Sequence, residues 1–331
     1  MTAAALDVVG IGNAIVDVIA QADEAFLKQQ QLVKGSMRLI DAAGAEALYG
    51  AMGPGIEMSG GAAGNTMAGV ASLGGKGAYI GKVRDDQLGG VFAHDMRANG
   101  VRFDTAPLTE GPPTARCLIL VTPDAQRTMN TFLGACVELG PEDIDPALIA
   151  SAQVMYLEGY LFDPPRAKAA FQKAAEIAHA AGRKVSLTLS DAFCVERYRA
   201  EFRALVEGHV DILFANEAEI CALYETSDFD QALTAVRGHC TIAALTRSER
   251  GSVIVTSDGT HRIAAAAIDK LVDTTGAGDL YASGFLFGLT HGRDLISCGR
   301  LGSLAAGEVI GHFGARPETR LSDLAHTAGL V

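Results

Sequence analysis

No stretch of this sequence approaches the roughly 18 consecutive apolar residues that a membrane-spanning helix requires, so we expect no membrane partner. Basic residues are scarce: lysine and arginine number 27 against 39 aspartates and glutamates, which gives a formal net charge of −12. The basic residues form no cluster, and a nucleic-acid partner is therefore not expected. The N-terminal residues have no basic start before their apolar side chains, which is atypical of a secretory signal and favours a cytoplasmic location.

Cysteine is also used sparingly, and no two cysteines form a Cys-x-x-Cys pair. The cysteines all fall within apolar segments, and they are Cys117, Cys136, Cys194, Cys221, Cys240 and Cys298. This pattern predicts buried, reduced thiols in a cytosolic protein. A chain of 331 residues with 49% hydrophobic and 20% charged residues is typical of a globular protein with a large core.

Short apolar runs recur along the chain with helical segments between them. The runs that we predict as strands span residues 7–12, 78–83, 154–158, 185–189, 211–214 and 242–246. This alternation predicts an α/β fold with a mainly parallel sheet covered by helices on both faces. Residues 252–256 and 261–264 are predicted to form a hairpin. Residues 33–40, 114–121 and 128–133 lack clear crossover helices, and we expect them to form a small antiparallel sheet.

The most informative chemical signal begins at Asp273, where the sequence reads DTTGAGD before an apolar helical pattern. Small residues before Asp279 allow the backbone to lie close to a ligand, and N–H groups at a helix N-terminus bind anions. Asp279 falls in the first turn, where a carboxylate beside an anion site indicates proton transfer. A glycine-rich turn with an ordinary capping aspartate is the alternative interpretation.

Polar residues also stand near the end of the first predicted strand. Asn13 and Asp17 lie at or just past its carboxyl end, where ligands bind in open α/β sheets. A second glycine-rich turn contains Gly60 and Gly61 and leads to Asn65, whose amide can both donate to and accept from sugar hydroxyls. These residues predict a sugar-binding site, and a turn asparagine with a solvated aspartate is the alternative.

Polar residues at three further sites, a pair, a turn and a single arginine, each have two interpretations. Asn216 and Glu219 follow a predicted strand, and their spacing fits either a hydrated Mg²⁺ site or a helix capping box. Thr246 and Gly251 bound a polar turn that could line a triphosphate or form a plain hairpin. Arg127 could fold over a substrate or lie on the surface.

Together these motifs resemble the ribokinase-like, or PfkB, carbohydrate kinase family, and most closely its adenosine-kinase-like branch. The resemblance covers essentially the whole chain. Residues 273–279 with 283–286 fit the family's C-terminal motif at every defined position. The N-terminal motif fits more loosely, because Gly64 replaces a more usual alanine and Met67 a small residue. Ser248 stands where many members have glycine.

The resemblance implies a role for each of these positions. Asp279 is the implied general base, and the 276–279 turn is the implied anion hole for the transferring phosphoryl group, through the N–H groups of Gly276, Ala277 and Gly278. Arg127 is implied to cover the substrate from a lid. The implied substrate-binding residues are Asn13, Asp17, Gly60, Gly61 and Asn65. The residues implied to contact ATP are Asn216, Thr246, Gly251, Thr275 and Gly278.

The implied cofactors are ATP as co-substrate and Mg²⁺, with Asn216 and Glu219 organising the metal and Glu219 acting through water. A monovalent cation such as K⁺ is implied near Asp273 and residues 311–316. The implied fold is one ribokinase-like domain over residues 1–331, a three-layer α/β/α sandwich. A small β-sheet lid is implied at about residues 15–58 and 112–133, in a monomer or a homodimer.

The activity expected from this resemblance is transfer of the γ-phosphoryl of Mg-ATP to the 5′-hydroxyl of adenosine. The spacing of Asn13 and Asp17 favours a nucleoside, and so does Tyr160, in an aromatic stretch that could meet a base. A sugar kinase acting on ribose, fructose or a related compound is one alternative. A non-catalytic nucleoside sensor on the same fold is the other.

Overall fold

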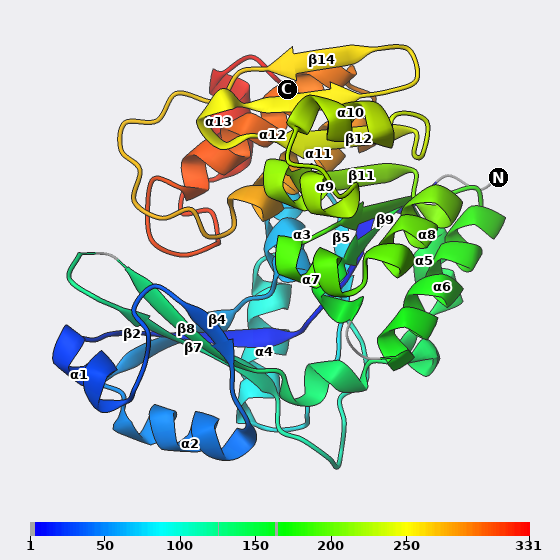
Figure 1. Cartoon of the computed structure of the whole chain (residues 1–331). Coiled ribbons are helices and arrows are strands. Elements are labelled where there is room, and N and C mark those ends of the chain that lie inside the picture. The colour runs from blue at the N-terminus through cyan, green and yellow to red at the C-terminus, as the bar shows by residue number, and fades with distance from the viewer. Residues whose placement is uncertain (1–3, 125, 163–164) are drawn as a thin grey trace.

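The computed structural model describes residues 4–124, 126–162 and 165–331. Figure 1 shows a large sheet between two layers of helices, with a smaller sheet to one side. The predicted α/β/α architecture with a second, small sheet is therefore confirmed.

The large sheet has nine strands in the order β14-β13-β12-β11-β10-β9-β1-β5-β6. Their bounds are β1 (Leu6–Ile11), β5 (Gly77–Ile80), β6 (Arg102–Phe103), β9 (Ala152–Glu158), β10 (Lys184–Thr188), β11 (Ile212–Asn216), β12 (Ile242–Thr246), β13 (Ser252–Val255) and β14 (Thr260–Ile263). In this order, all neighbouring pairs from β12 through to β6 at the end of the sheet are parallel. The β12–β13 and β13–β14 pairs are antiparallel. The predicted hairpin is the β13–β14 pair.

Helices cover both faces because successive strand residues enter opposite cores. Val9 packs in a cluster with one helical layer, α5 (Pro146–Ser151), α6 (Pro165–Ala180), α7 (Ala192–Arg197), α8 (Arg199–His209), α9 (Glu217–Leu223) and α10 (Phe229–Val236). Val8 packs with the other layer, α3 (Ala62–Ser72), α4 (Gln87–Ala98), α11 (Ala277–Thr290) and α12 (Leu295–Val309), against which α13 (Leu321–Thr327) lies. Within the described ranges, no helix combines the length and apolarity needed to cross a bilayer.

The second sheet has five strands in the order β3-β8-β7-β2-β4. Its strands are β2 (Ile15–Gln21), β3 (Met37–Leu39), β4 (Gly55–Ser59), β7 (Ala115–Val121) and β8 (Arg127–Phe132), and α1 (Glu24–Gln29) and α2 (Ala42–Ala51) connect them. The division of the chain into a core and a lid at residues 15–58 and 112–133 stays a prediction.

The prediction that the second sheet is antiparallel is wrong in part. β2 pairs with β7 in parallel, and β3 pairs with β8 in parallel, whereas the β2–β4 and β7–β8 pairs are antiparallel. The direction of the β3–β8 pair was mispredicted because it depends on segments that lie far apart in the chain. The β2–β7 pair was missed because β2 was not recognised as a strand. It follows β1 after only a short connection and alternates buried and partly exposed residues, so β1 and β2 carry the chain directly from one sheet into the other.

None of the six cysteines, all of which lie within the described residues, forms a disulfide bond. Cys117, Cys136, Cys194 and Cys298 are buried. Cys221 and Cys240 are only partly buried, so the prediction of burial is wrong for these two. Cys221 lies in α9, and Cys240 lies in the connection between α10 and β12. Both are packed against the edge of the core and are only partly covered by it.

Candidate active site

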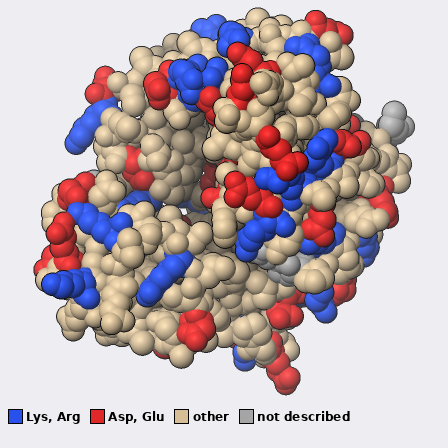
Figure 2. Space-filling view, in the orientation of Figure 1, with Lys and Arg blue, Asp and Glu red and all other residues tan. Residues whose placement is uncertain are grey.

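A cavity of about 570 Å³ lies between the carboxyl ends of the large-sheet strands and the second sheet. Figure 2 shows the hollow, with acidic and basic side chains mixed around it. The predicted residues that line it are Asn13, Asp17, Gly61, Asn65, Tyr160, Asn216, Glu219, Thr246, Thr275, Gly276, Ala277, Gly278 and Asp279. Three predicted residues, Gly60, Arg127 and Gly251, are not part of the lining.

The N-terminus of α11 faces this cavity. Gly276 precedes the helix in the left-handed conformation, with φ of 77°, which glycine adopts without strain. The N–H of Ala277 donates to Thr274 O at 3.2 Å, whereas those of Gly278 and Asp279 have no acceptor among the described residues. Free N–H groups at the positive end of a helix dipole suit an anion such as phosphate.

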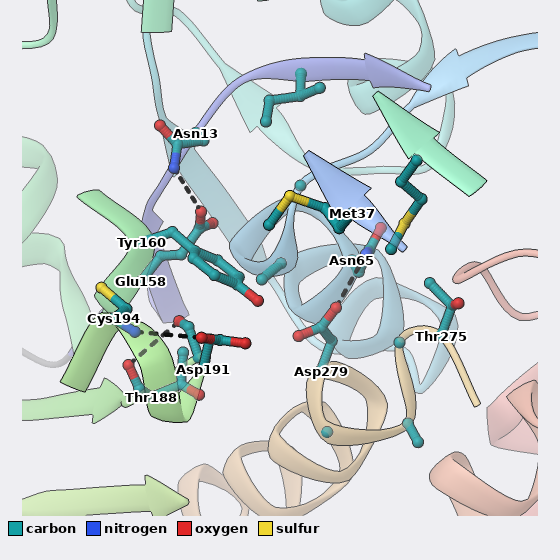
Figure 3. Close-up of a pocket in the computed structure, with 18 of the residues that line it drawn as sticks. Asn13, Met37, Asn65, Glu158, Tyr160, Thr188, Asp191, Cys194, Thr275 and Asp279 are labelled. Atoms are coloured by element: carbon teal, nitrogen blue, oxygen red, sulfur yellow. Dashed lines mark hydrogen bonds between the residues drawn. The ribbon is translucent and has the colours of Figure 1, made fainter. Parts of the chain in front are cut away.

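Asp279 lies in the first turn of α11, with its carboxylate at the cavity. Asn65 Nδ2 donates to Asp279 Oδ2 at 2.9 Å, and Figure 3 shows the two side chains meeting across the cavity. Removal from bulk water raises the pKa of Asp279 to about 6, while the Asn65 bond and the Arg316 charge oppose the rise. A carboxylate with this pKa is ionised at neutral pH and can still accept a proton.

The glycines of the second glycine-rich turn pack closely against Asn13 and Asp17 beside the cavity. Gly61 precedes α3 with φ of 83°, and a side chain on it would overlap the carbonyl oxygen of Asn13. A side chain on Gly60 would overlap the Asp17 carboxylate. Gly60 therefore acts on the site by leaving room for Asp17, even though it does not line the cavity.

Asp17 and Arg127 both belong to the second sheet. Burial raises the pKa of Asp17 to about 6, the charges of Arg316 and Arg127 lower it, and the charge of Asp279 raises it further. Arg127 Nη2 lies 2.7 Å from Asp273 Oδ2, with both side chains buried. The Nε and Nη2 groups of Arg127 have no well-directed hydrogen bond within the described part of the chain, so this pair joins the two sheets as an ionic contact.

Glu158 is a buried carboxylate of the site that the sequence analysis missed. Its Oε1 accepts from Asn13 Nδ2 at 2.9 Å, and its Oε2 accepts from Ala63 N at 2.8 Å. Burial raises the pKa of Glu158 to about 7, against the lowering effect of these bonds. A glutamate closing an otherwise apolar predicted strand at 154–158 was the available signal.

Asn216 and Glu219 form the capping box that was one of their two interpretations. Glu219 N donates to Asn216 Oδ1, and Asn216 N donates to Glu219 Oε2, each at 2.9 Å. Both residues also line the cavity. Burial raises the pKa of Glu219 to about 7, and the charges of Asp191 and Asp279 raise it further. Within the described residues, no three acidic, histidine or cysteine side chains lie close enough to hold a metal ion, so a Mg²⁺ that fits here would keep most of its water and approach Glu219 through it.

The turn between Thr246 and Gly251 is shaped by its own backbone. A side chain on Gly251, where φ is 77°, would overlap the carbonyl oxygen of Ile263. Ser248 has φ of 51°, so the residue that departs from the family's glycine still adopts a left-handed conformation. Arg247 Nη2 lies 3.0 Å from Glu217 Oε1. Of the two residues of this turn that were predicted to contact ATP, Thr246 lines the cavity and Gly251 does not.

The other side of the cavity is largely apolar. Side chains from the second sheet, from the short helical turn after β9 and from α7 after β10 line it, among them Met37, Leu39, Ile119, Tyr160 and Phe193. Tyr160 and Met37 face each other in Figure 3. Several of these side chains are exposed, which leaves an apolar wall beside the polar groups around Asp279.

The chain matches the pfkB family of carbohydrate kinases over residues 57–320. Adenosine kinase from Sinorhizobium meliloti is 58% identical, with a TM-score of 0.91 over 98% of this chain and 99% of that chain. A structure from Rhizobium etli CFN 42, described as a probable sugar kinase, is 56% identical, with a TM-score of 0.93 over 99% and 100% of the two chains. Adenosine kinase from Saccharomyces cerevisiae is 27% identical over 307 residues, 86% of this chain and 89% of the relative. The chain therefore belongs to the pfkB family of carbohydrate kinases, and it is a phosphotransferase that uses an alcohol group as acceptor.

Proposed function

We propose that this protein transfers the γ-phosphoryl group of Mg-ATP to the 5′-hydroxyl of a nucleoside, with adenosine preferred. The observation that carries the proposal is the position of Asp279. Its carboxylate lies within one helical turn of free backbone N–H groups and is oriented by Asn65. A base beside an anion hole is what transfer of a phosphoryl group to a hydroxyl requires.

The acceptor side is built from Asn13, Asp17 and Asn65. Asp17 is ionised at neutral pH and accepts hydrogen bonds from vicinal hydroxyls, while the two amides can donate or accept. Glu158 holds the Asn13 amide at 2.9 Å, so this side chain is oriented before substrate binds. The hydroxyl that receives the phosphoryl group gives its proton to Asp279.

The phosphate side is built from the start of α11 and the groups around it. The N–H groups of Gly278 and Asp279 bind the transferring phosphoryl oxygens, and Arg127, whose Nε and Nη2 lack a well-directed hydrogen bond, adds a positive charge to this side of the site. Glu219 would hold Mg²⁺ through water, and Thr246 would contact ATP. When bound there, Mg²⁺ would supply positive charge that neutralises the phosphates.

The apolar wall favours a nucleoside over a free sugar. A sugar alone offers mainly hydroxyls and would leave the wall formed by Met37, Leu39 and Phe193 without an apolar partner. A purine base has flat apolar faces that bury such side chains and stack on Tyr160. The name of the Sinorhizobium meliloti relative, adenosine kinase, supports the same acceptor.

A sugar kinase is the second candidate, and Glu158 favours it. A buried carboxylate that lines the cavity is a suitable acceptor for further sugar hydroxyls. Relatives named fructokinase and ribose-1-phosphate kinase cover more than two thirds of this chain. Asp279 and the free N–H groups at the start of α11 weigh against a nucleoside sensor, because a protein that only binds a nucleoside needs neither.

The test is ADP release from Mg-ATP with a panel of acceptors. Adenosine, inosine, guanosine, cytidine, ribose and fructose are compared at equal concentration, and the product is identified by mass. We expect the highest kcat/KM with adenosine and formation of AMP. Strong turnover with a free sugar and none with nucleosides would establish the sugar kinase. Nucleoside binding without ADP release would establish the sensor.

A further inference from the structure

The segment at residues 311–320 contacts both glycine-rich turns of the site. Ala315 packs on Gly276, where an added Cβ would lie only 2.7 Å from the Cβ of Ala315. Arg316 extends to the other turn: its Nη2 donates to Ser59 O at 2.9 Å, and its Nη1 donates to Gly64 O at 2.9 Å. One short segment therefore fixes the distance between the start of α11 and the start of α3.

The guanidinium of Arg316 holds the 59–64 turn at both ends. Its Nε also donates to Ser59 O at 3.2 Å, and its Nη2 donates to Ser59 Oγ at 2.8 Å. Ser59 is itself fixed by Asp95, whose Oδ2 accepts from Ser59 N at 2.9 Å. The planar fork of arginine gives such contacts a fixed geometry that lysine does not reproduce. Asn65, which orients Asp279, directly follows this turn.

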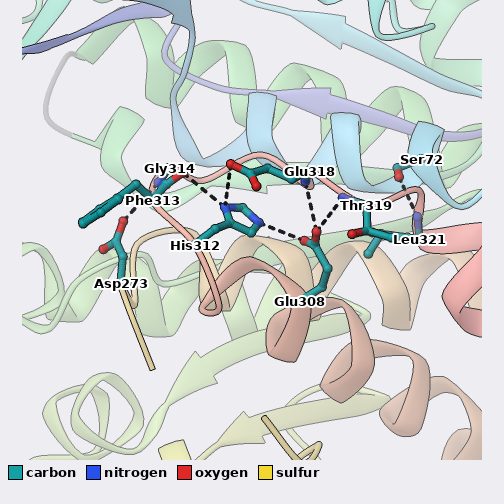
Figure 4. Close-up of polar contacts among 9 residues, drawn as sticks. All are labelled: Ser72, Asp273, Glu308, His312, Phe313, Gly314, Glu318, Thr319 and Leu321. Atoms are coloured by element: carbon teal, nitrogen blue, oxygen red, sulfur yellow. Dashed lines mark hydrogen bonds and ion pairs between the residues drawn. The ribbon is translucent and has the colours of Figure 1, made fainter. Parts of the chain in front are cut away.

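The segment that carries Arg316 is itself held at both ends, as Figure 4 shows. Glu308 Oε1 accepts from Glu318 N at 3.0 Å and from Thr319 N at 2.7 Å. His312 Nε2 lies 3.3 Å from Glu308 Oε2. At the other end, Gly314 N donates to Asp273 Oδ2 at 3.2 Å. Arg316 is therefore presented to the turn by a fixed loop.

We propose that Arg316 is a positioning residue for phosphoryl transfer, which holds the 59–64 turn so that Asn65 orients Asp279 and which places a positive charge near that carboxylate. The inference rests on the proposed role of Asp279 as the base. Arg316 does not line the cavity, and it acts through Asn65 and through its charge.

The charge of Arg316 opposes the effect of burial on the base. Burial raises the pKa of Asp279, and the Asn65 bond and Arg316 lower it. The other ionisable groups that interact with Asp279 are the carboxyl groups of Asp17, Glu158 and Glu219 and the neutral phenols of Tyr156 and Tyr160. Loss of the Arg316 charge would therefore raise the pKa of Asp279 and reduce its ionised fraction at neutral pH.

The test compares two substitutions at Arg316 by single-turnover kinetics at saturating Mg-ATP and acceptor between about pH 5 and 9. In Arg316→Gln, which lacks the charge, we expect the acidic limb of the rate profile to move up by roughly one pH unit. In Arg316→Lys, which keeps the charge but not the fork, we expect the limb to stay in place and the rate to fall at every pH. Arg320→Gln is the matched control, because it removes an equal charge from an exposed site, and its limb should not move.

If Asp279→Asn has lost turnover and the acidic limb of the Arg316→Gln rate profile coincides with that of the wild type, the inference is overturned. Full turnover in Asp279→Asn instead overturns the proposed function, and this inference with it. If Arg316→Gln does not fold, as judged by its thermal unfolding midpoint, Arg316→Lys decides. A lysine variant with the wild-type rate at every pH overturns the positioning role.

Discussion

Asp279 lies under two opposing influences, because its site must exclude water and yet keep a carboxylate ionised. Burial raises its pKa to about 6, which makes it a better base than a solvated aspartate. The Asn65 bond and the nearby positive charge keep the pKa below neutral pH. The environment therefore sets the proton affinity near the value at which a base is both ionised and reactive.

Replacing Asp279 by asparagine tests this assignment at a single atom. Asp279→Asn keeps the shape and a hydrogen bond to Asn65, so the fold and ATP binding should persist while turnover falls by about 10²–10⁴-fold. The wild-type rate should rise with pH through about 6, as the carboxylate ionises. ADP release and ATP binding are measured side by side, with the exposed substitution Asp258→Asn as control. Turnover within a few-fold of wild type would contradict the assignment.

Glu158 predicts a pH dependence of stability. Its folded pKa of about 7 lies above the ordinary value of 4.5, so the folded protein binds this proton more tightly than the unfolded chain does. The resulting stability is fully present below about pH 4.5 and is lost as pH rises through about 7. The free energy of unfolding, measured in urea, should therefore be larger at about pH 5.5 than at about pH 8.

Glu158→Gln isolates this contribution. The amide oxygen can still accept from Ala63 N, and the amide nitrogen can donate to the Asn13 side chain once that amide is turned. The difference between the two pH values should shrink in the variant. An unchanged difference would show that Glu158 is not the group responsible.

The start of α11 depends on close packing of three helices. Gly69 of α3 lies against Ser283, and Gly284 lies against the backbone of Leu301 in α12. A side chain at either glycine would overlap its neighbour, so these small residues bring α3 and α12 close to α11. The helix N-terminus is thereby fixed beside the cavity.

Two glycines of the α11 turn should respond differently to the same substitution. Gly276→Ala places a Cβ against Ala315 and forces a left-handed conformation, and it should cost about 1–3 kcal/mol of stability. A Cβ on Gly278 meets no atom within 4 Å, so Gly278→Ala should keep the stability but hinder phosphate approach and raise the KM for ATP. Thermal unfolding and ATP kinetics are measured for both. Equal effects on stability would contradict this distinction.

On the scale of the whole molecule, the cavity exists because two sheets meet. The second sheet contributes Asp17 and part of the apolar wall, and the segments that follow strands of the large sheet contribute the start of α11, Glu219 and the rest of the wall. Arg127 and Asp273 join the sheets through an ionic contact of 2.7 Å. Asp273 also accepts from Thr275 N and Gly314 N, so this contact connects the second sheet to the loops around the anion site.

Loss of the contact between the sheets should admit water to the site. Arg127→Met keeps an unbranched side chain but leaves Asp273 unpaired, and we expect slower acceptor phosphorylation with a larger fraction of ATP hydrolysed by water. ADP and phosphorylated acceptor are quantified in the same reaction. Lys34→Met is the control, because Lys34 pairs with Glu24 and Asp124 near the second sheet and away from the core. An unchanged ratio of hydrolysis to transfer would contradict the prediction.

The local sequence determined much of this protein. Alternating strands and helices predicted the large sheet, because periodicity reflects which faces are buried. The DTTGAGD stretch predicted the helix N-terminus that presents Asp279, since left-handed glycines and helix starts are local conformations. The spacing of Asn216 and Glu219 allowed either a capping box or a ligand site, and the structure has a capping box whose two residues also line the cavity.

Only the tertiary structure decided which distant residues meet. The bond between Asn13 and Glu158 spans 145 positions, and that between Ser59 and Arg316 spans 257. Neither pair has a spacing that a local sequence pattern could reveal. The charged members of the two pairs, Glu158 and Arg316, are not marked in the sequence by a helix or turn signal. The proton affinity of Asp279 likewise depends on burial and on Arg316, which are properties of the assembled fold.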